Sequence, residues 1–308
     1  MSVTTPQETA LAPAVPVKIE TPFQRFLSDF FESTVATGAF IVLLGIVGIA
    51  IFASLISPTN PYDLAIVSVV DSRLPPGSQN MDGVTVWLGS DGAGRDLLSA
   101  IFYGLRISLG VGVASGLVAM CIGSAVGLTA AYFGGRTDSV IMRVVDLQLS
   151  FPAILVALVL LAVLGKGVDK IIIALVVVQW AYYARTVRAS ALVERNKEYV
   201  EAAMCLALSH RRIVFRHLLP NCMPPLIVVV TLQTAHAISL EATLSFLGVG
   251  LPITEPSLGL LIANGFEYML SGKYWISFFP GVALLITIVS INLVGDQLRD
   301  VLNPRLQR

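Results

Sequence analysis

The chain has 308 residues, of which 55% are hydrophobic and only 13% are charged. A soluble domain usually carries about 25% charged residues, and a single water-facing core cannot hold this much apolar surface. The formal net charge is zero, so composition gives no indication of a nucleic-acid partner. Composition therefore predicts an integral membrane protein whose outer surface is solvated by the lipid bilayer.

The first 36 residues are polar and rich in proline. They predict a cytoplasmic N-terminal tail in which residues 21–32 can form a short interfacial helix. The tail carries Glu20, Asp29 and Glu32, and no small-residue cleavage site follows the first apolar run. Because a signal peptide has the opposite character, we expect the first apolar run to stay in the mature protein.

Six apolar runs follow, and a helix needs about 20 mostly apolar residues to cross a bilayer. They cover residues 37–56, 107–133, 147–164, 171–184, 225–247 and 274–294. We expect the third helix to begin near Asp138, and the short fourth helix to continue through Arg185 and Arg188 into the interface. The sequence predicts an all-α, six-helix transmembrane domain over residues 37–308.

Basic residues predict the orientation of the bundle. With the N-terminus in the cytoplasm, fourteen of the twenty lysines and arginines fall on the inner side and six on the outer side. This excess is the one expected for cytoplasmic loops, and six spans then place the C-terminus inside as well. Two connections are long: an outer loop over residues 57–106 and a cytoplasmic loop over residues 185–224.

The cytoplasmic loop contains two short stretches with helical spacing. Apolar residues from Tyr199 to Ala207 recur at intervals that predict a helix with one apolar face. Ser209 can cap a second helix beginning near His210, and Pro220 marks the return into the membrane. This pattern alone leaves two interpretations open: an element that receives force from another subunit, or a helix pair that merely packs under the bundle.

The order of residues in this loop is similar to a known motif. Glu201-Ala202-Ala203, followed in the same loop by Leu219-Pro220, resembles the EAA motif of bacterial ABC importer permeases. The motif usually has glycine where this chain has Ala207, a departure that would stiffen the turn between the two helices.

Three further blocks are similar to the dipeptide/oligopeptide branch of this family, in particular to its "C" subunits. They are residues 88–96 with 103–109, residues 131–135 with 142–146 and 151–152, and residues 244–248 with 292–300 and 303–305. The resemblance runs from about residue 25 to the C-terminus, although the loop between Gly250 and Gly259 departs from the family's proline-rich pattern.

The resemblance implies a type I ABC importer permease in the bacterial cytoplasmic membrane. Its partners would be a similar second permease in a heterodimer, two cytoplasmic ATP-binding subunits and an extracytoplasmic substrate-binding protein. Residues of the EAA loop would couple this chain to the ATPase. They are Tyr199, Val200, Glu201, Ala202, Ala203, Ala207, Leu208, Arg212, Leu219 and Pro220. Glu201 would accept hydrogen bonds at that boundary, or would form an ordinary surface ion pair with an arginine such as Arg212.

Charged residues also cluster just before the second apolar run. Asp91, Gly94, Arg95, Asp96 and Arg106 could shape an outer gate or a dock for the binding protein. The alternative is local: Asp91 and Asp96 cap the helix start, and Arg95 pairs with a neighbour.

Four polar residues are expected at membrane depth, where an ionisable group normally faces a partner or a watery path. Asp146, Gln233, His236 and Glu241 are therefore candidates for the translocation pathway. Glu241 could meet the ammonium group of a peptide, or could equally brace a neighbouring helix.

Several enzyme and metal motifs are absent from the sequence. No stretch fits GxxxxGK[ST], GxSxG or HExxH, so we expect no bound nucleotide, no cofactor and no catalysis by this chain. Cysteines and histidines show no metal-site spacing, and we expect free thiols. Three alternatives to a peptide importer stay open. They are the same importer architecture for nickel or another small solute, an ion-coupled secondary carrier, and an intramembrane enzyme.

Overall fold

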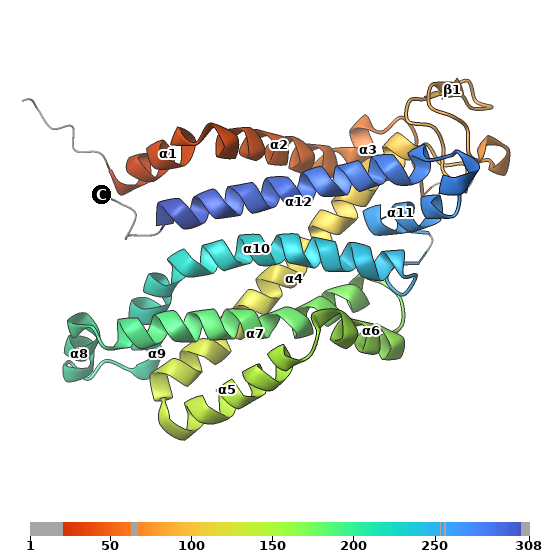
Figure 1. Cartoon of the computed structure of the whole chain (residues 1–308). Helices are drawn as coiled ribbons and strands as arrows, with labels where there is room; N and C mark the ends of the chain where they lie inside the picture. Colours follow the sequence, from red (N-terminus) through yellow and green to blue (C-terminus); the bar gives the residue numbers. More distant parts are fainter. Residues whose placement is uncertain (1–20, 63–66, 253, 256, 303–308) are drawn as a thin grey trace, which may run out of the picture.

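The computed structural model of the chain describes residues 21–62, 67–252, 254–255 and 257–302. It is a bundle of long helices, with α4 crossing behind α10 and α7 (Figure 1). Helices α8 and α9 lie at one end of the bundle, and the short strand β1 and helix α11 lie at the other. The predicted cytoplasmic loop and the predicted outer loop are therefore at opposite ends.

Five described helices are long and apolar enough to cross a membrane, and a bent helix pair gives a sixth span when its two helices are taken together. The five are α2 (Thr34–Ile51), α4 (Leu97–Phe133), α7 (Val168–Arg195), α10 (Leu219–Phe246) with the turns that precede it, and α12 (Trp275–Leu302). The bent pair is α5 (Gly135–Ser150) and α6 (Ala153–Leu164). The prediction of a six-span helical bundle is confirmed.

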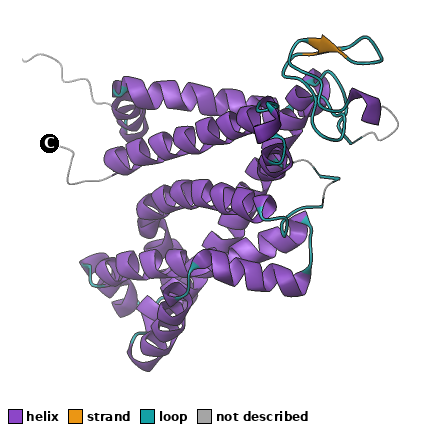
Figure 2. Ribbon diagram, turned by 45° about the vertical axis from the view of Figure 1, so that its right-hand side comes forward, coloured by secondary structure: helices purple, strands orange, loops and turns teal. Residues whose placement is uncertain are grey.

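Shorter elements lie at both ends of the bundle. The remaining ones in chain order are α1 (Pro22–Glu32), α3 (Ala53–Ile56), η1 (Val69–Asp71), β1 (Ser78–Gln79), β2 (Thr85–Val86), α8 (Glu198–Cys205), α9 (His210–Arg212), the π-helical η2 (Ile213–Leu218), α11 (Leu258–Phe266) and η3 (Met269–Ser271). Strands β1 and β2 pair antiparallel within the outer loop, and Figure 2 shows this strand pair beyond the helix ends.

The helix expected in the N-terminal tail forms over Pro22–Glu32. Thr21 and Gln24 make a capping box at its start, and Ser33 caps the following α2. Phe30 is buried against α12, in a cluster with Val294 and Val301.

The third span is broken, so the prediction of one continuous helix over residues 147–164 is wrong. Helix α5 ends at Ser150, α6 begins at Ala153, and the two meet at an angle of 89°. The cause lies in Pro152, because the residue before a proline is pushed out of the helical region. Phe151 accordingly has φ −90° and ψ 140°.

Three other spans extend further than their apolar runs. Helix α4 begins at Leu97 rather than near residue 107, and α10 begins at Leu219 rather than Pro225. Helix α7 continues past Ala184 through Arg185 and Arg188 to Arg195, as expected. A helix satisfies its own backbone groups in water as well as in lipid, so hydrophobicity does not limit its length. Pro224 and Pro225 lie inside α10, so the prediction that this span begins at residue 225 is wrong, whereas Pro220 lies in its first turn as expected.

Glycines bring α4 and α7 into direct backbone contact. A Cβ atom added at Gly123 would lie 2.4 Å from the carbonyl oxygen of Trp180, and one at Gly127 would lie 2.4 Å from that of Ala184. Lipid supplies no hydrophobic force between helices, so association depends on such close packing. Gly123 and Gly127 thus allow α4 and α7 to pack backbone against backbone.

Candidate functional site

The segment between α7 and α10, residues 196–218 (the α7–α10 segment), folds as two short helices under the bundle. Helix α8 contains Tyr199 to Ala203, and α9 begins at His210 as expected. Ser209 occupies the N-cap position, although its side chain makes no capping hydrogen bond. The predicted pair of short cytoplasmic helices is therefore present.

One face of this segment packs on the bundle. Val200, Ala203, Ile213 and Leu218 are buried in a single cluster that includes Tyr132 at the inner end of α4. Further members of this cluster are Leu128, Val187, Ala191, Cys222 and Leu226. The segment is thus joined to α4, α7 and α10 through a shared apolar core.

The opposite face of the segment is exposed and partly apolar. Leu206 is 74% exposed and Phe215 is 62% exposed, while Glu201, Ala202 and Arg212 are also exposed. Exposed apolar groups among charged ones mark a surface for binding another protein.

A hydrogen-bond network holds α8 to two membrane helices. Tyr199 donates to a Glu194 carboxylate oxygen of α7 at 2.7 Å, and Asn221 of α10 donates to the Tyr199 hydroxyl oxygen at 3.2 Å. Lys197 pairs with the same Glu194 at 2.7 Å. Burial, and next the hydrogen bond to Glu194, raise the pKa of Tyr199 to about 12. The tyrosine therefore stays protonated and donates at any physiological pH.

The turn after α8 explains why glycine is usual at this place in the motif. Ala207 has φ +52°, a left-handed conformation that costs an L-residue about 1–2 kcal/mol and that glycine adopts freely. The next residue, Leu208, donates its backbone N–H to Ala203 at 3.2 Å and is half-buried. Alanine is thus tolerated here at a cost in strain.

The remaining residues predicted to couple to the ATPase are more exposed than Val200 and Ala203. Glu201 and Arg212 are both exposed, and neither takes part in an ion pair within the described residues. The alternative of a surface ion pair between Glu201 and an arginine such as Arg212 is therefore not observed, and the Glu201 carboxylate is accessible to a partner. Leu219 and Pro220 form the first turn of α10, where Pro220 is exposed.

At the outer end, four of the five predicted residues hold the loop in shape. Arg95 donates to Asp91 at 2.7 Å with both side chains buried, and Asp91 also accepts from the Arg95 backbone. Asp96 caps α4 by accepting from the backbone and hydroxyl of Ser99 at 2.9 and 2.6 Å. A Cβ atom at Gly94 would lie 2.1 Å from a backbone oxygen. The local interpretation is confirmed for the Asp96 cap and for the Arg95–Asp91 pair, whereas Asp91 caps the preceding turn rather than α4.

Arg106 differs from those four because it lies inside α4 and is exposed. Nearby, Tyr62 stacks edge-to-face on Tyr103 at 5.2 Å. Burial, and next the charge of Glu255, raise the pKa of Tyr62 to about 12.

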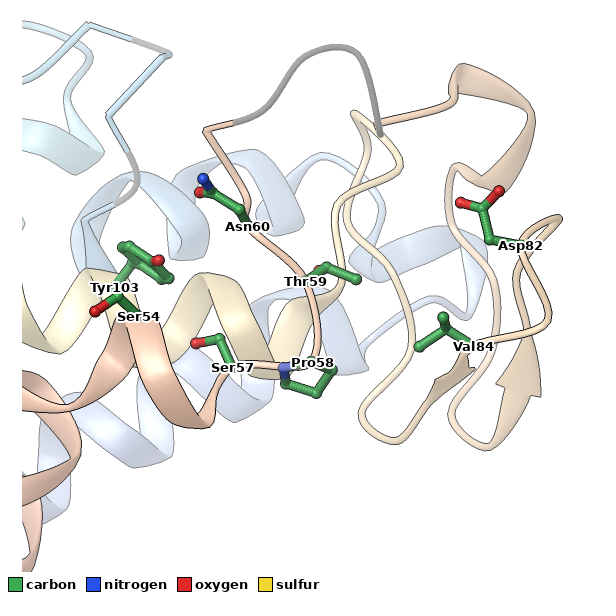
Figure 3. A pocket seen from close by; sticks show the side chains of 8 residues that line it. All are labelled: Ser54, Ser57, Pro58, Thr59, Asn60, Asp82, Val84 and Tyr103. Atoms are coloured by element: carbon green, nitrogen blue, oxygen red, sulfur yellow. The ribbon is translucent and has the colours of Figure 1, made fainter.

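A cavity of about 330 Å³ opens beside Tyr103 at the outer end (Figure 3). Mostly small and polar side chains line it: Ser54, Ser57, Pro58, Thr59, Asn60, Asp82, Val84 and Tyr103. The described residues contain no group of histidines, cysteines and carboxylates able to hold a metal ion.

The four polar residues expected at membrane depth do not form one site. Glu241 is fully buried and accepts from Ser108 of α4 at 2.9 Å and from Ser245 at 2.7 Å. This geometry is that of a brace between α4 and α10. Asp146 is exposed and pairs with Arg185 of α7 at 2.6 Å.

Gln233 and His236 differ from Glu241 in their surroundings. His236 and Ser239 are exposed on α10, and Gln233 is half-buried with an unpaired amide nitrogen. These side chains lie on an open face of the chain, where they can meet a partner or a solute.

Sequence reasoning missed two contacts that hold the segment and the broken span in place. His210 accepts or donates a hydrogen bond with Tyr132 of α4 at 2.6 Å, and Arg188 of α7 binds both carboxylate oxygens of Asp138 at 2.5 Å. Both pairs join residues far apart in the chain, so no local spacing could have indicated them.

Comparison with known proteins identifies the family. Residues 123–308 match the family described as binding-protein-dependent transport system inner membrane component. The chain belongs to this family. Residues 21–76 match the N-terminal transmembrane domain of oligopeptide transport permease C, so the family assignment covers both ends of the chain. The protein is thus a multi-pass inner-membrane permease of an ABC importer, and the predicted class, fold and location are confirmed.

Relatives match this chain over most of their own length. The di/tripeptide transport system permease protein of Pseudomonas aeruginosa is 36% identical, over 93% of each chain. The oligopeptide transport system permease protein of Bacillus subtilis is also 36% identical, over 91% of this chain and 88% of the relative. An inward-facing structure of a methionine ABC transporter has a TM-score of 0.55 at 21% identity, covering 67% of this chain and 98% of that one, which supports the fold.

Proposed function

We propose that this permease carries di- or oligopeptides into the cell and that its α7–α10 segment docks on a cytoplasmic ATPase subunit. Relatives named for di/tripeptide and oligopeptide transport support the cargo. The docking proposal rests on the exposed surface that contains Leu206, Phe215 and the unpaired Glu201. Exposed apolar side chains beside charged ones are typical of a surface that binds another protein.

In this proposal ATP is hydrolysed on two separate subunits, and the permease binds no nucleotide or other cofactor. The sequence contains no phosphate-binding GxxxxGK[ST] stretch. ATP binding would move the ATPase subunits, and the docked segment would pass that movement to α4, α7 and α10 through their shared apolar core.

The pathway would run along the open face of α10 and be completed by a second, similar permease. His236 and Ser239 are exposed on a helix that is otherwise suited to lipid. Polar side chains at this depth normally face a partner or a water-filled cavity, which supports a pathway shared between two subunits. Gln233 would line the same face, and Glu241 would brace it from behind.

An extracytoplasmic binding protein would deliver the cargo to the outer end. The buried Asp91–Arg95 pair and the Asp96 cap would give the outer loop the rigidity that a docking surface needs. Arg106 would be available for direct contact, because its side chain is exposed at the same end.

The test begins with gentle extraction of the tagged subunit from its native membrane, followed by identification of its partners by mass spectrometry. The purified complex is then placed in vesicles and offered an isotope-labelled peptide hydrolysate, with radioactive nickel ion as the competing probe. ATP-dependent accumulation of labelled di- or oligopeptides supports the proposal. Accumulation of nickel instead would refute the peptide cargo, and uptake driven by an ion gradient without ATP would refute the mechanism.

A further inference from the structure

Helix α9 is fastened to the bundle by one side-chain hydrogen bond within the described residues. The Tyr132 hydroxyl and His210 Nδ1 are 2.6 Å apart, and the centroids of their edge-to-face rings are 5.5 Å apart. The ring centroid of Phe133 lies 6.4 Å from that of the same imidazole. Helix α8 is instead tied to α7 and α10 through Tyr199. The side-chain hydrogen bonds of the two short helices therefore run to different membrane helices, although both helices contribute to the shared apolar core or adjoin it.

The helix to which α9 is attached reaches the outer end of the protein. Helix α4 has 37 residues, which at about 1.5 Å per residue gives a rod of roughly 55 Å. Tyr132 lies in its last turn, while near its outer end the Ser99 hydroxyl accepts from the Thr59 backbone at 3.1 Å. Ser108 of the same helix binds Glu241 of α10 at 2.9 Å.

The packing around Tyr132 gives this attachment a stiff base. Tyr132 is buried in the cluster that also holds Ile213 and Leu218 of the π-helical turn after α9. Arg195 at the end of α7 donates to the backbone carbonyl of Ala131, one residue before Tyr132, at 2.9 Å. A displacement of α9 would therefore act on a well-held point of α4.

We propose that Tyr132 and His210 are positioning residues for transport: their hydrogen bond makes α4 follow α9 when an ATPase displaces the α7–α10 segment. The movement would reach the outer end along α4 and be passed to α10 through Ser108 and Glu241. The inference rests on the proposed docking of this segment on an ATPase, and adds the helix that carries the movement outward.

The experiment uses the complete reconstituted complex and the isotope-labelled peptide hydrolysate. It measures peptide accumulated per ATP hydrolysed in Tyr132→Phe, His210→Ala and the double variant. Asparagine can place an acceptor oxygen where the histidine has Nδ1, so His210→Asn is the conservative variant. Tyr182→Phe is the matched control, because the Tyr182 hydroxyl makes no hydrogen bond in the described part of the chain and its ring is 41% exposed.

Loss of one hydrogen bond typically shifts an equilibrium about 3- to 10-fold. We expect Tyr132→Phe and His210→Ala each to lower peptide uptake per ATP by about that factor, with the double variant no worse than either. His210→Asn and the control should stay within about twofold of wild type, a change below the effect expected for one lost hydrogen bond. Additive losses, or normal coupling in an assembled Tyr132→Phe complex, would overturn the inference. If wild type itself shows no ATP-driven peptide uptake, the proposed function fails instead.

Discussion

Replacing Glu201 with arginine tests the proposed docking surface most directly. The Glu201 side chain is exposed in the first turn of α8 and pairs with no described cation. Folding should therefore lose only the favourable interaction of a carboxylate with the helix N-terminus, about 0.3–1 kcal/mol. The variant should insert and assemble with the membrane helices normally.

Docking should suffer much more than folding. A reversed charge at a protein interface costs on the order of 2–4 kcal/mol, which weakens binding by roughly 30- to 700-fold. Glu201 has no alternative partner among the described residues. In the proposed complex its carboxylate accepts a hydrogen bond from a group on the ATPase, and the introduced arginine would face that same donor group.

The assay compares capture of the ATPase subunits by Glu201→Arg and wild-type permease, followed by ATP-driven uptake of labelled peptides in vesicles. Glu32→Arg is the control, since Glu32 is exposed at the end of α1. This substitution makes the same change of charge at a site outside the α7–α10 segment. We expect loss of capture and uptake in Glu201→Arg alone. Normal uptake by that variant would refute the docking role of the exposed face of α8.

Three further predictions concern the features that hold the bundle together. Gly123→Val should destabilise the protein by about 1–3 kcal/mol, because a Cβ there would lie 2.4 Å from a backbone oxygen of α7; thermal unfolding in detergent measures this, and Gly110→Ala, which meets nothing within 4 Å, should unfold near wild type. Asp96→Ala should cost about 1 kcal/mol by removing the cap of α4, whereas Asp96→Asn should retain most of that stability in the same assay. Since the pKa of Tyr199 is raised from 10.0 to about 12, its contribution to stability is complete below pH 10 and is lost as the pH rises through 12. Tyr199→Phe should remove this alkaline loss from the melting curve, and an unchanged difference between pH 9 and 12 would contradict the role of its bond to Glu194.

Composition and local spacing were sufficient to predict the membrane class and the approximate positions of the spans. A segment in the bilayer must satisfy its backbone hydrogen bonds internally and present an apolar surface. A run of about 20 apolar residues therefore predicts a membrane helix. The cap at Asp96 was likewise predictable, because a cap depends on neighbours within a few residues. Ser209 takes the predicted position before His210, but its side chain makes no capping hydrogen bond. The helical spacing of apolar residues from Tyr199 to Ala207 also predicted the short helix α8 of the α7–α10 segment.

Only the tertiary structure decided where the helices end and which distant side chains meet. The 89° bend at Pro152 and the passage of α10 through Pro225 depend on packing as well as on proline itself. Glu241 is a brace because Ser108, 133 residues away in the chain, reaches it. The Tyr132–His210 contact spans 78 residues. Composition and periodicity report local propensity and burial, whereas a contact between distant residues arises from how whole helices pack, which no local spacing specifies.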